Sequence, residues 1–188
     1  MKSFPVRRPL SLLTVLLGTA LWTACGSNSN GRPAEAPSRR AERAVPSGDE
    51  NRAPGFSLLD TQGKTVALAD FKGQVVFIDF WATWCPPCRM SMPLVEKLHA
   101  AYQGKPVQVL GLNLDEDPDD VRKFVAKKQT PYPVLLAGNS DISSAYGVGG
   151  IPHFVLIDQE GRVAGVWPGF ASGMDKEWRA AIDKLLGV

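Results

Sequence analysis

The feature of this sequence that most restricts its fold is a pair of cysteines between a strand pattern and a helix pattern. Val75–Trp81 is a nearly continuous apolar run, as in a central strand covered on both faces. Cys85 and Cys88 follow closely, and the apolar spacing over residues 87–103 predicts a helix. We therefore expect both cysteines at the junction of a central strand and the first turn of a helix.

This junction predicts a reactive thiol at Cys85. The unpaired N–H groups of a first helical turn and the positive end of the helix dipole both stabilise a thiolate. Cys88 lies one turn further in, where we expect it to be more buried and close enough for a disulfide. Pro86 and Pro87 remove donors from the first turn and stiffen the loop. A nucleophilic thiol and a resolving thiol are what disulfide exchange requires.

The remaining composition excludes other kinds of site. The chain has three cysteines, which allow neither a four-cysteine zinc site nor a network of several disulfides. His99 and His153 are too far apart in sequence to suggest a ligand pair, and we expect no metal and no cofactor. Residues 53–188 hold 13 Lys and Arg against 15 Asp and Glu. That balance lacks the basic footprint of a nucleic-acid-binding domain, so no nucleic-acid partner is expected.

The N-terminal region is typical of an export signal. Basic residues precede the mostly apolar stretch Leu10–Trp22, which as a helix would span only about 20 Å of the roughly 30 Å hydrocarbon core. Thr23-Ala24-Cys25 resembles a bacterial lipobox, so we expect residues 1–24 to be a lipoprotein-type signal peptide and Cys25 to carry the lipid. An ordinary secretory signal is the alternative. Residues 25–52 are polar and predict a flexible membrane tether ahead of a domain at 53–188.

The rest of the domain alternates strand and helix patterns. The order is β-α-β-α, followed by a β-hairpin and a terminal helix. It predicts an α/β fold whose mixed sheet has parallel and antiparallel parts and helices on both faces. The expected strands and helices, besides those above, are a hairpin at 56–59 and 65–68, a strand at 107–113, a helix at 118–128 capped by Asp117, a strand at 133–136, a helical turn at 142–146, a second hairpin at 153–157 and 162–167, and a helix at 174–186.

Two segments carry a family resemblance. Asp79-Phe80-Trp81-Ala82-x-Trp84-Cys85-x-x-Cys88 and Gly150-Ile151-Pro152 resemble the corresponding segments of thioredoxins. The hairpin before the central strand and the inserted strand at 133–136 make the domain similar to the TlpA/ResA-like membrane-anchored thiol-disulfide oxidoreductases. The resemblance covers about residues 53–188. It implies a thioredoxin-like mixed sheet flanked by helices, with an N-terminal β-hairpin and an inserted strand.

The resemblance also implies a substrate-binding surface. The matching proline of the family is cis and lies against the disulfide, so Pro152 is expected there. Ile151 would then offer its backbone to a substrate strand. The residues expected to contact substrate are therefore Trp84, Pro86, Pro87, Ile151 and Pro152.

Two acids are candidates for moving the proton that Cys88 must lose. Asp79 matches the buried acid of thioredoxins and shares a strand face with Phe77 and Trp81, so desolvation should raise its pKa. The alternative is an exposed acid at a strand end. Glu116 resembles an active-site glutamate of the ResA-like members, but it also fits a solvated run of acids. Which of the two acids acts stays open.

The function that the resemblance implies is reduction of protein disulfides outside the cytoplasm. Expected substrates are c-type apocytochromes or copper-site assembly proteins, and a membrane thiol donor would restore the dithiol. We expect a lipid-anchored monomer in the bacterial cell envelope, facing the periplasm or the exterior. Two alternatives are a thiol peroxidase and a copper-binding chaperone. Ala82 and Ile78 replace the Thr or Ser and the Pro of the peroxidases, and the C-x-x-x-C spacing usual in the chaperones is absent.

Overall fold

A computed structural model describes residues 51–188 of the chain. The predicted signal peptide, Cys25 and all but the last two residues of the predicted tether lie outside the described residues. Within 51–188, no helix has the length and apolar character needed to cross a membrane. The elements in chain order are β1 (Ser57–Leu59), β2 (Thr65–Ala67), the 3₁₀ helix η1 (Leu68–Phe71), β3 (Val75–Trp81), α1 (Pro86–Ala101), β4 (Val107–Asn113), α2 (Pro118–Lys128), β5 (Val134–Leu136), α3 (Ile142–Ala145), β6 (His153–Ile157), β7 (Val163–Pro168) and α4 (Met174–Leu186).

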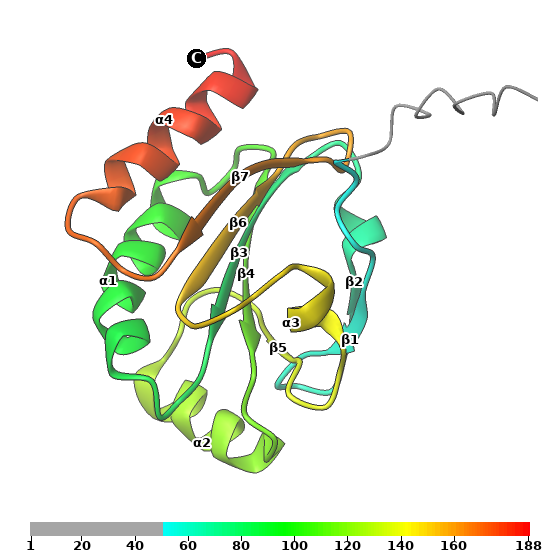
Figure 1. Ribbon diagram of the computed structural model, residues 1–188, viewed down its shortest axis with the longest axis vertical. Helices are drawn as coiled ribbons and strands as arrows, with labels where there is room; N and C mark the ends of the chain where they lie inside the picture. The colour runs from blue at the N-terminus through cyan, green and yellow to red at the C-terminus, as the bar shows by residue number, and fades with distance from the viewer. Residues whose placement is uncertain (1–50) are drawn as a thin grey trace, which may run out of the picture. The chain divides into compact units, whose positions relative to one another are not determined.

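The main sheet has five strands in the order β5-β4-β3-β6-β7 (Figure 1). β3 pairs in parallel with β4, and β4 in parallel with β5, whereas β6 is antiparallel to both β3 and β7. β1 and β2 form a separate antiparallel hairpin. The predicted mixed sheet, the N-terminal hairpin and the inserted strand are therefore confirmed. Every residue of the central strand β3 is buried, as its apolar run predicted.

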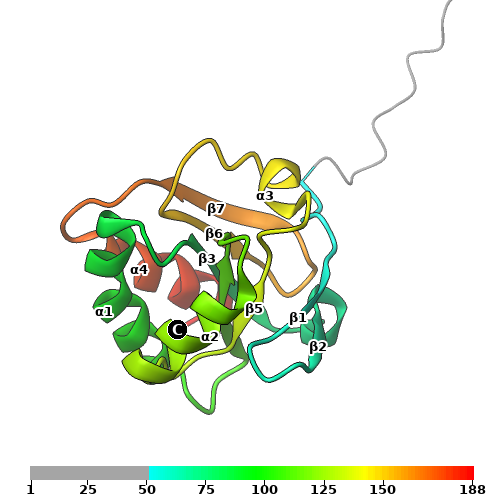
Figure 2. The same ribbon diagram turned by 90° about the horizontal axis from the view of Figure 1, so that it is seen from below.

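Helices cover both faces of the sheet. Figures 1 and 2 show α1, α2 and α4 on one face, and α3 with the β1–β2 hairpin on the other. Alternate residues of β3 divide between two cores, because neighbouring side chains of a strand point to opposite faces. Phe77 and Trp81 join the core under α1 and α4, and Ile78 and Phe80 join the core under α3.

The cysteine pair lies at the edge of the sheet where β3 and β4 end and α1 and α2 begin. The two strands run parallel, so their carboxyl ends lie at the same edge, where sites of open α/β sheets commonly form. Asp117 caps α2 by accepting a hydrogen bond from the Asp119 N–H, and Pro118 takes the first helical position, both as predicted. Cys85 is the N-cap of α1. The loops between these strands and helices hold the residues discussed next.

Candidate active site

Cys85 and Cys88 form a disulfide at the start of α1, with their Cα atoms 5.3 Å apart. The Cys88 N–H donates to Cys85 Sγ at 3.3 Å, and the Cys85 carbonyl accepts from the Arg89 N–H at 3.2 Å. The expected position of the pair and its bonding distance are confirmed. Cys85 is only 2% exposed and Cys88 is fully buried. The two sulfurs therefore differ less in burial than the sequence suggested.

The two thiols nevertheless face different electrostatic surroundings. Cys85 receives a first-turn N–H on its sulfur and sits at the positive end of the α1 dipole. Both effects favour a thiolate once the disulfide is reduced. Cys88 lies inside the first turn with no solvent contact, and burial disfavours its charged form. These surroundings therefore favour the thiolate form at Cys85 over that at Cys88.

The loop before β6 lies against this disulfide. The Ile151–Pro152 peptide bond is cis, as the resemblance implied, and the Ile151 carbonyl oxygen is 3.8 Å from Cys85 Sγ. Pro152 is buried and Ile151 is half-buried. Trp84 is 67% exposed, and Pro86 and Pro87 are exposed as well. Their predicted contacts with substrate stay predictions.

Met90 is an exposed apolar side chain that the sequence analysis did not single out. It lies in the first turns of α1 and is 64% exposed. Trp84 and Met90 thus bracket the disulfide in sequence, and large exposed apolar side chains near a reactive group favour contact with another protein chain. The sequence could have indicated the exposure of Met90, because this residue lies to one side of the apolar stripe that α1 buries.

Asp79 is fully buried on β3. Neither of its carboxylate oxygens has a hydrogen-bond partner within residues 51–188. Desolvation by burial raises the pKa of Asp79 to about 8. The expected raised pKa is confirmed, and the alternative of an exposed acid at a strand end is wrong. Burial therefore favours the neutral form of the Asp79 carboxyl near pH 7.

Two aromatic side chains with buried polar atoms lie over the strand partner of Asp79 on β4. Its partner on β4 is Gly111, over which the Trp81 indole and the Tyr132 ring lie: a Cβ at 111 would be 3.0 Å from Trp81 Nε1 and 3.1 Å from Tyr132 Cε2. Trp81 Nε1 and the Tyr132 hydroxyl also have no hydrogen-bond partner among the described residues. Burial, and then the charge of Asp79, raises the pKa of Tyr132. The absence of a side chain at Gly111 makes room for this buried cluster.

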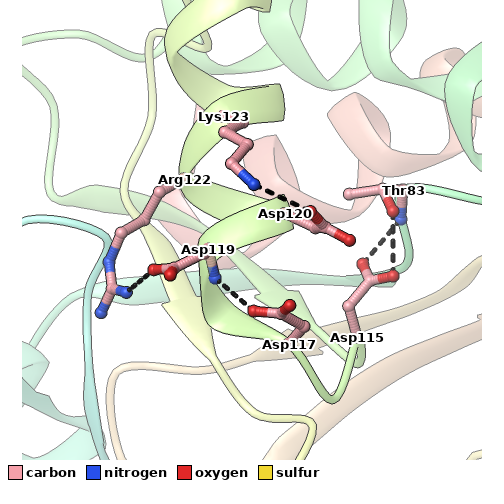
Figure 3. Close-up of polar contacts among 7 residues, drawn as sticks. All are labelled: Thr83, Asp115, Asp117, Asp119, Asp120, Arg122 and Lys123. Atoms are coloured by element: carbon pink, nitrogen blue, oxygen red, sulfur yellow. Dashed lines mark hydrogen bonds and ion pairs between the residues drawn. The ribbon is translucent and has the colours of Figure 1, made fainter.

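Glu116 lies outside this buried cluster. Its side chain is exposed, and its backbone oxygen accepts from Asn139 Nδ2 at 3.1 Å. Asp119 and Asp120 on α2 form exposed ion pairs with Arg122 and Lys123, as expected for a solvated acidic run (Figure 3). The catalytic role of Glu116 stays a prediction.

Asp115, the first acid of that run, does not belong to the solvated surface. It is half-buried and accepts hydrogen bonds from the Thr83 N–H at 2.8 Å and the Thr83 hydroxyl at 2.9 Å (Figure 3). The sequence analysis missed both residues. The available signal was that Thr83 and Asp115 each follow one of two neighbouring strands, which in a parallel pair end at the same edge.

The described residues present no grouping suited to a metal. In 51–188, no three or more His, Cys, Asp or Glu side chains lie close enough together to hold a metal ion. The groups at this edge of the sheet with chemistry of their own are the two sulfurs, the neighbouring N–H donors and the buried carboxyl.

Fold and site together define a class. A five-stranded mixed sheet, helices on both faces, a Cys-x-x-Cys disulfide at the start of α1 and a cis-proline beside it are the features of a thioredoxin-fold protein with an active-site disulfide. The chain belongs to the Redoxin family, whose model matches residues 47–178, and it is a ResA/TlpA-like member of the thioredoxin superfamily.

Individual relatives agree with this membership. The chain is 40% identical over 111 residues to the thiol-disulfide oxidoreductase ResA of Bacillus thuringiensis subsp. konkukian, a match that covers 59% of this chain and 64% of that ResA, less than two thirds of its length. A Chlorobium tepidum protein assigned as the thiol:disulfide interchange protein DsbE has a TM-score of 0.69 at 36% identity, covering 73% of this chain and 96% of its own. The exposed lipoprotein thioredoxin Etrx1 of Streptococcus pneumoniae has a TM-score of 0.63 at 26% identity, covering 70% and 99%.

Proposed function

We propose that this protein is a thiol-disulfide oxidoreductase that reduces protein disulfides in the bacterial cell envelope. The observation that carries the proposal is the Cys85–Cys88 disulfide at the start of α1, with a first-turn N–H on the Cys85 sulfur. That arrangement provides a nucleophile that is stabilised as a thiolate and a second thiol within bonding distance. The name of the ResA relative, a thiol-disulfide oxidoreductase, supports the same activity.

The first step uses the reduced protein. The Cys85 thiolate attacks one sulfur of a substrate disulfide, which forms a bond between Cys85 and the substrate and releases the other substrate sulfur as a thiolate. The hydrogen bond from the Cys88 N–H holds Cys85 at the helix start during this attack. Exposed Trp84, with Pro86 and Pro87, offers a surface for the substrate chain around the reacting sulfurs.

The second step releases the substrate. Cys88 gives up its proton and attacks Cys85 Sγ, which restores the Cys85–Cys88 disulfide and frees the second substrate sulfur as a thiolate. Two electrons have then passed from the dithiol to the substrate. Since Cys88 is fully buried, its proton needs an acceptor. Asp79, whose pKa burial raises to about 8, is mostly protonated at pH 7, so its ionised fraction would accept the proton, and a pKa close to that of a thiol favours the transfer. Glu116 is the alternative acceptor.

The proposed substrate and the proposed electron donor rest on the family resemblance. We propose that the disulfides reduced are those of c-type apocytochromes or of copper-site assembly proteins. Each turnover leaves the Cys85–Cys88 disulfide, so a thiol donor in the membrane must supply two electrons to restore the dithiol. The exposed side chains of Trp84 and Met90 suit an extended polypeptide substrate better than a small polar molecule.

The proposed location rests on the N-terminal sequence. We propose that Cys25 is lipidated after removal of residues 1–24, and that residues 25–52 tether the domain to the membrane on its periplasmic or exterior side. Support comes from the lipobox-like junction and from the name of Etrx1, which describes that relative as an exposed lipoprotein. A monomer is sufficient for the proposed chemistry, since both thiols come from one chain.

Insulin reduction by the full-length protein in detergent tests the proposed activity. The reduced protein should release insulin thiols, the Cys85→Ser variant should release none, and the Cys88→Ser variant should accumulate a mixed disulfide through Cys85. Cys25→Ser is the matched control, because it removes the third cysteine and should leave the rate in detergent unchanged. Full activity of Cys85→Ser would overturn the proposal. In cells, the protein trapped on Cys88→Ser identifies the substrate.

A further inference from the structure

The loop that carries the reactive cysteine is short, and one distant side chain, that of Asp115, forms hydrogen bonds with it. It joins β3 to α1 through a turn from Ala82 to Cys85, closed by the Cys85 N–H donating to the Ala82 carbonyl at 3.2 Å. Thr83 is the second residue of this turn, and both its N–H and its hydroxyl bond to the Asp115 carboxylate (Figure 3). Trp84, the third, is 67% exposed and packs little against the domain. Asp115 therefore supplies the side-chain contacts that hold the turn.

Asp115 is itself fixed by its neighbours at the end of β4. Asn113, which is fully buried, donates through Nδ2 to Asp115 Oδ2 at 2.8 Å and accepts from the Asp115 N–H at 2.9 Å. The Asn113 carbonyl accepts from the Ala137 N–H at 2.8 Å. These bonds tie the Asp115 loop to the sheet on one side and to the segment after β5 on the other.

Gly138 closes the far side of this arrangement. A Cβ at residue 138 would overlap the carbonyl oxygen of Asp115, so only glycine lets the segment after β5 lie this close. The neighbouring Asn139 side chain donates to the Glu116 carbonyl at 3.1 Å. Asp115 therefore packs against Gly138 through its backbone, while its carboxylate accepts the hydrogen bonds from Thr83. Because Asn113 also fixes this carboxylate, its hydrogen bonds to Thr83 restrict the position of the turn from Ala82 to Cys85.

We infer that Asp115, acting through Thr83, is a positioning residue that sets Cys85 Sγ at the start of α1. This inference rests on the proposed function, because it concerns the reactivity of the same thiol. The sulfur is stabilised as a thiolate only while it stays beside the first-turn N–H groups, one of which it already accepts at 3.3 Å. Thr83 is two residues from Cys85, so releasing it frees the turn that ends at the sulfur.

A purely electrostatic role for Asp115 would have the opposite effect on Cys85. A negative charge near a thiol disfavours the thiolate, so removing the charge should make Cys85 more acidic and faster to react at neutral pH. Loss of positioning should make Cys85 less acidic, because its sulfur leaves the N–H donors of the helix start. The sign of the change therefore separates the two roles.

The test measures iodoacetamide alkylation of Cys85 in the reduced full-length protein across pH, with the modified peptide identified by mass spectrometry. Asp115→Asn replaces a carboxylate that accepts two bonds from Thr83 with an amide whose NH₂ would face a donor. Thr83→Val removes the hydroxyl without changing charge, and Thr83→Ser keeps it. Asp119→Asn is the matched control, since it removes an equal charge from an exposed ion pair on α2.

We expect Asp115→Asn and Thr83→Val to raise the apparent pKa of Cys85 by roughly half a unit to one unit. That shift corresponds to about a threefold to tenfold slower alkylation at pH values below the pKa of Cys85. Thr83→Ser and Asp119→Asn should behave like the unchanged protein. Alkylation of Thr83→Val at the unchanged rate, or of Asp115→Asn at a faster one, would overturn the inference, and so would a Thr83→Ser variant as slow as Thr83→Val.

The alkylation readout is independent of the proposed substrate. A protein that fails to reduce insulin but shows these alkylation changes would contradict the proposed function and leave the positioning role intact. If the unchanged protein reduces insulin but Asp115→Asn and Thr83→Val alter neither insulin reduction nor alkylation, the proposed function stands and the positioning role is contradicted. If Asp115→Asn does not fold, Thr83→Val and Thr83→Ser still decide the question, because neither alters the Thr83 N–H bond to Asp115.

Discussion

Replacing Asp79 with Asn should make the stability of the disulfide form less dependent on pH. Asp79 is fully buried, and neither of its oxygens has a hydrogen-bond partner within residues 51–188. Desolvation raises its pKa from 3.8 to about 8. In the folded protein the carboxyl therefore keeps its proton to about pH 8, whereas in the unfolded chain it ionises near pH 4. The asparagine amide does not ionise in either state.

The size of the effect follows from this difference in pKa. Because the folded-state pKa lies above the unfolded value, the contribution of Asp79 to stability is fully present below about pH 4 and is lost as pH rises toward 8. The loss is about 1.4 kcal/mol per pH unit, or roughly 4 kcal/mol at pH 7. Burying an amide without partners costs about 1–3 kcal/mol. Asp79→Asn should therefore be no more stable than the original protein at pH 4 and roughly 1–3 kcal/mol more stable at pH 7.

Urea unfolding of the disulfide form, followed by circular dichroism at pH 4.5, 6 and 7.5, measures this directly. The control is Asp120→Asn, whose side chain is exposed in an ion pair on α2 and whose effect should stay within about 0.5 kcal/mol at each pH. The difference between Asp79→Asn and the unchanged protein should grow steadily with pH. A difference that is constant from pH 4.5 to 7.5 would refute the assignment of a raised pKa to Asp79.

The same variant should separate the two steps of disulfide exchange. Without a carboxylate to accept the Cys88 proton, release of the mixed disulfide should slow by on the order of 10²-fold at neutral pH, while attack by Cys85 is little changed. The intermediate should accumulate at pH 7 and disappear as pH rises and Cys88 ionises unaided. Stopped-flow traces in which both steps slow equally, or neither does, would remove Asp79 from the mechanism. Glu116→Gln would then be the variant to examine.

Three further results are expected. Gly111→Ala should lower the free energy of unfolding by about 1–3 kcal/mol in urea titrations, because the new Cβ would press on buried Trp81 and Tyr132; a change under 0.5 kcal/mol would mean that the cluster can relax. Trp84→Ala should raise KM for insulin while leaving Tm and the reaction with a small aromatic disulfide unchanged, since its side chain is exposed; equal losses with both substrates would argue against a contact with the protein substrate. Mass spectrometry of the mature protein should find a lipid-modified Cys25 as its N-terminal residue, and an unmodified thiol or cleavage elsewhere would leave only secretion.

The sequence by itself determined the local structure of this domain. The apolar run Val75–Trp81 became the fully buried strand β3, and Asp117 with Pro118 began α2 as expected. The cysteine pair took its place at the start of α1, and the family resemblance correctly implied the cis bond before Pro152. Strand and helix patterns, caps and turn residues act between neighbours in the chain, so they can be read without the tertiary structure. Some observed ends differ from the expected ones by one or two residues, as in β5, which begins at Val134, and in β7, which runs from Val163 to Pro168.

The tertiary structure decided which residues of similar appearance act differently. In the sequence, Asp115 and Glu116 belong to one acidic run, yet Asp115 holds Thr83 across 32 residues of chain and Glu116 is exposed. Tyr132 gave no signal before the fold placed its ring over Gly111, beside Asp79. Such differences depend on strand order and on what packs over each side chain. The free energy of a charge or a hydrogen-bonding group is set by its surroundings, and those surroundings come from segments distant in sequence.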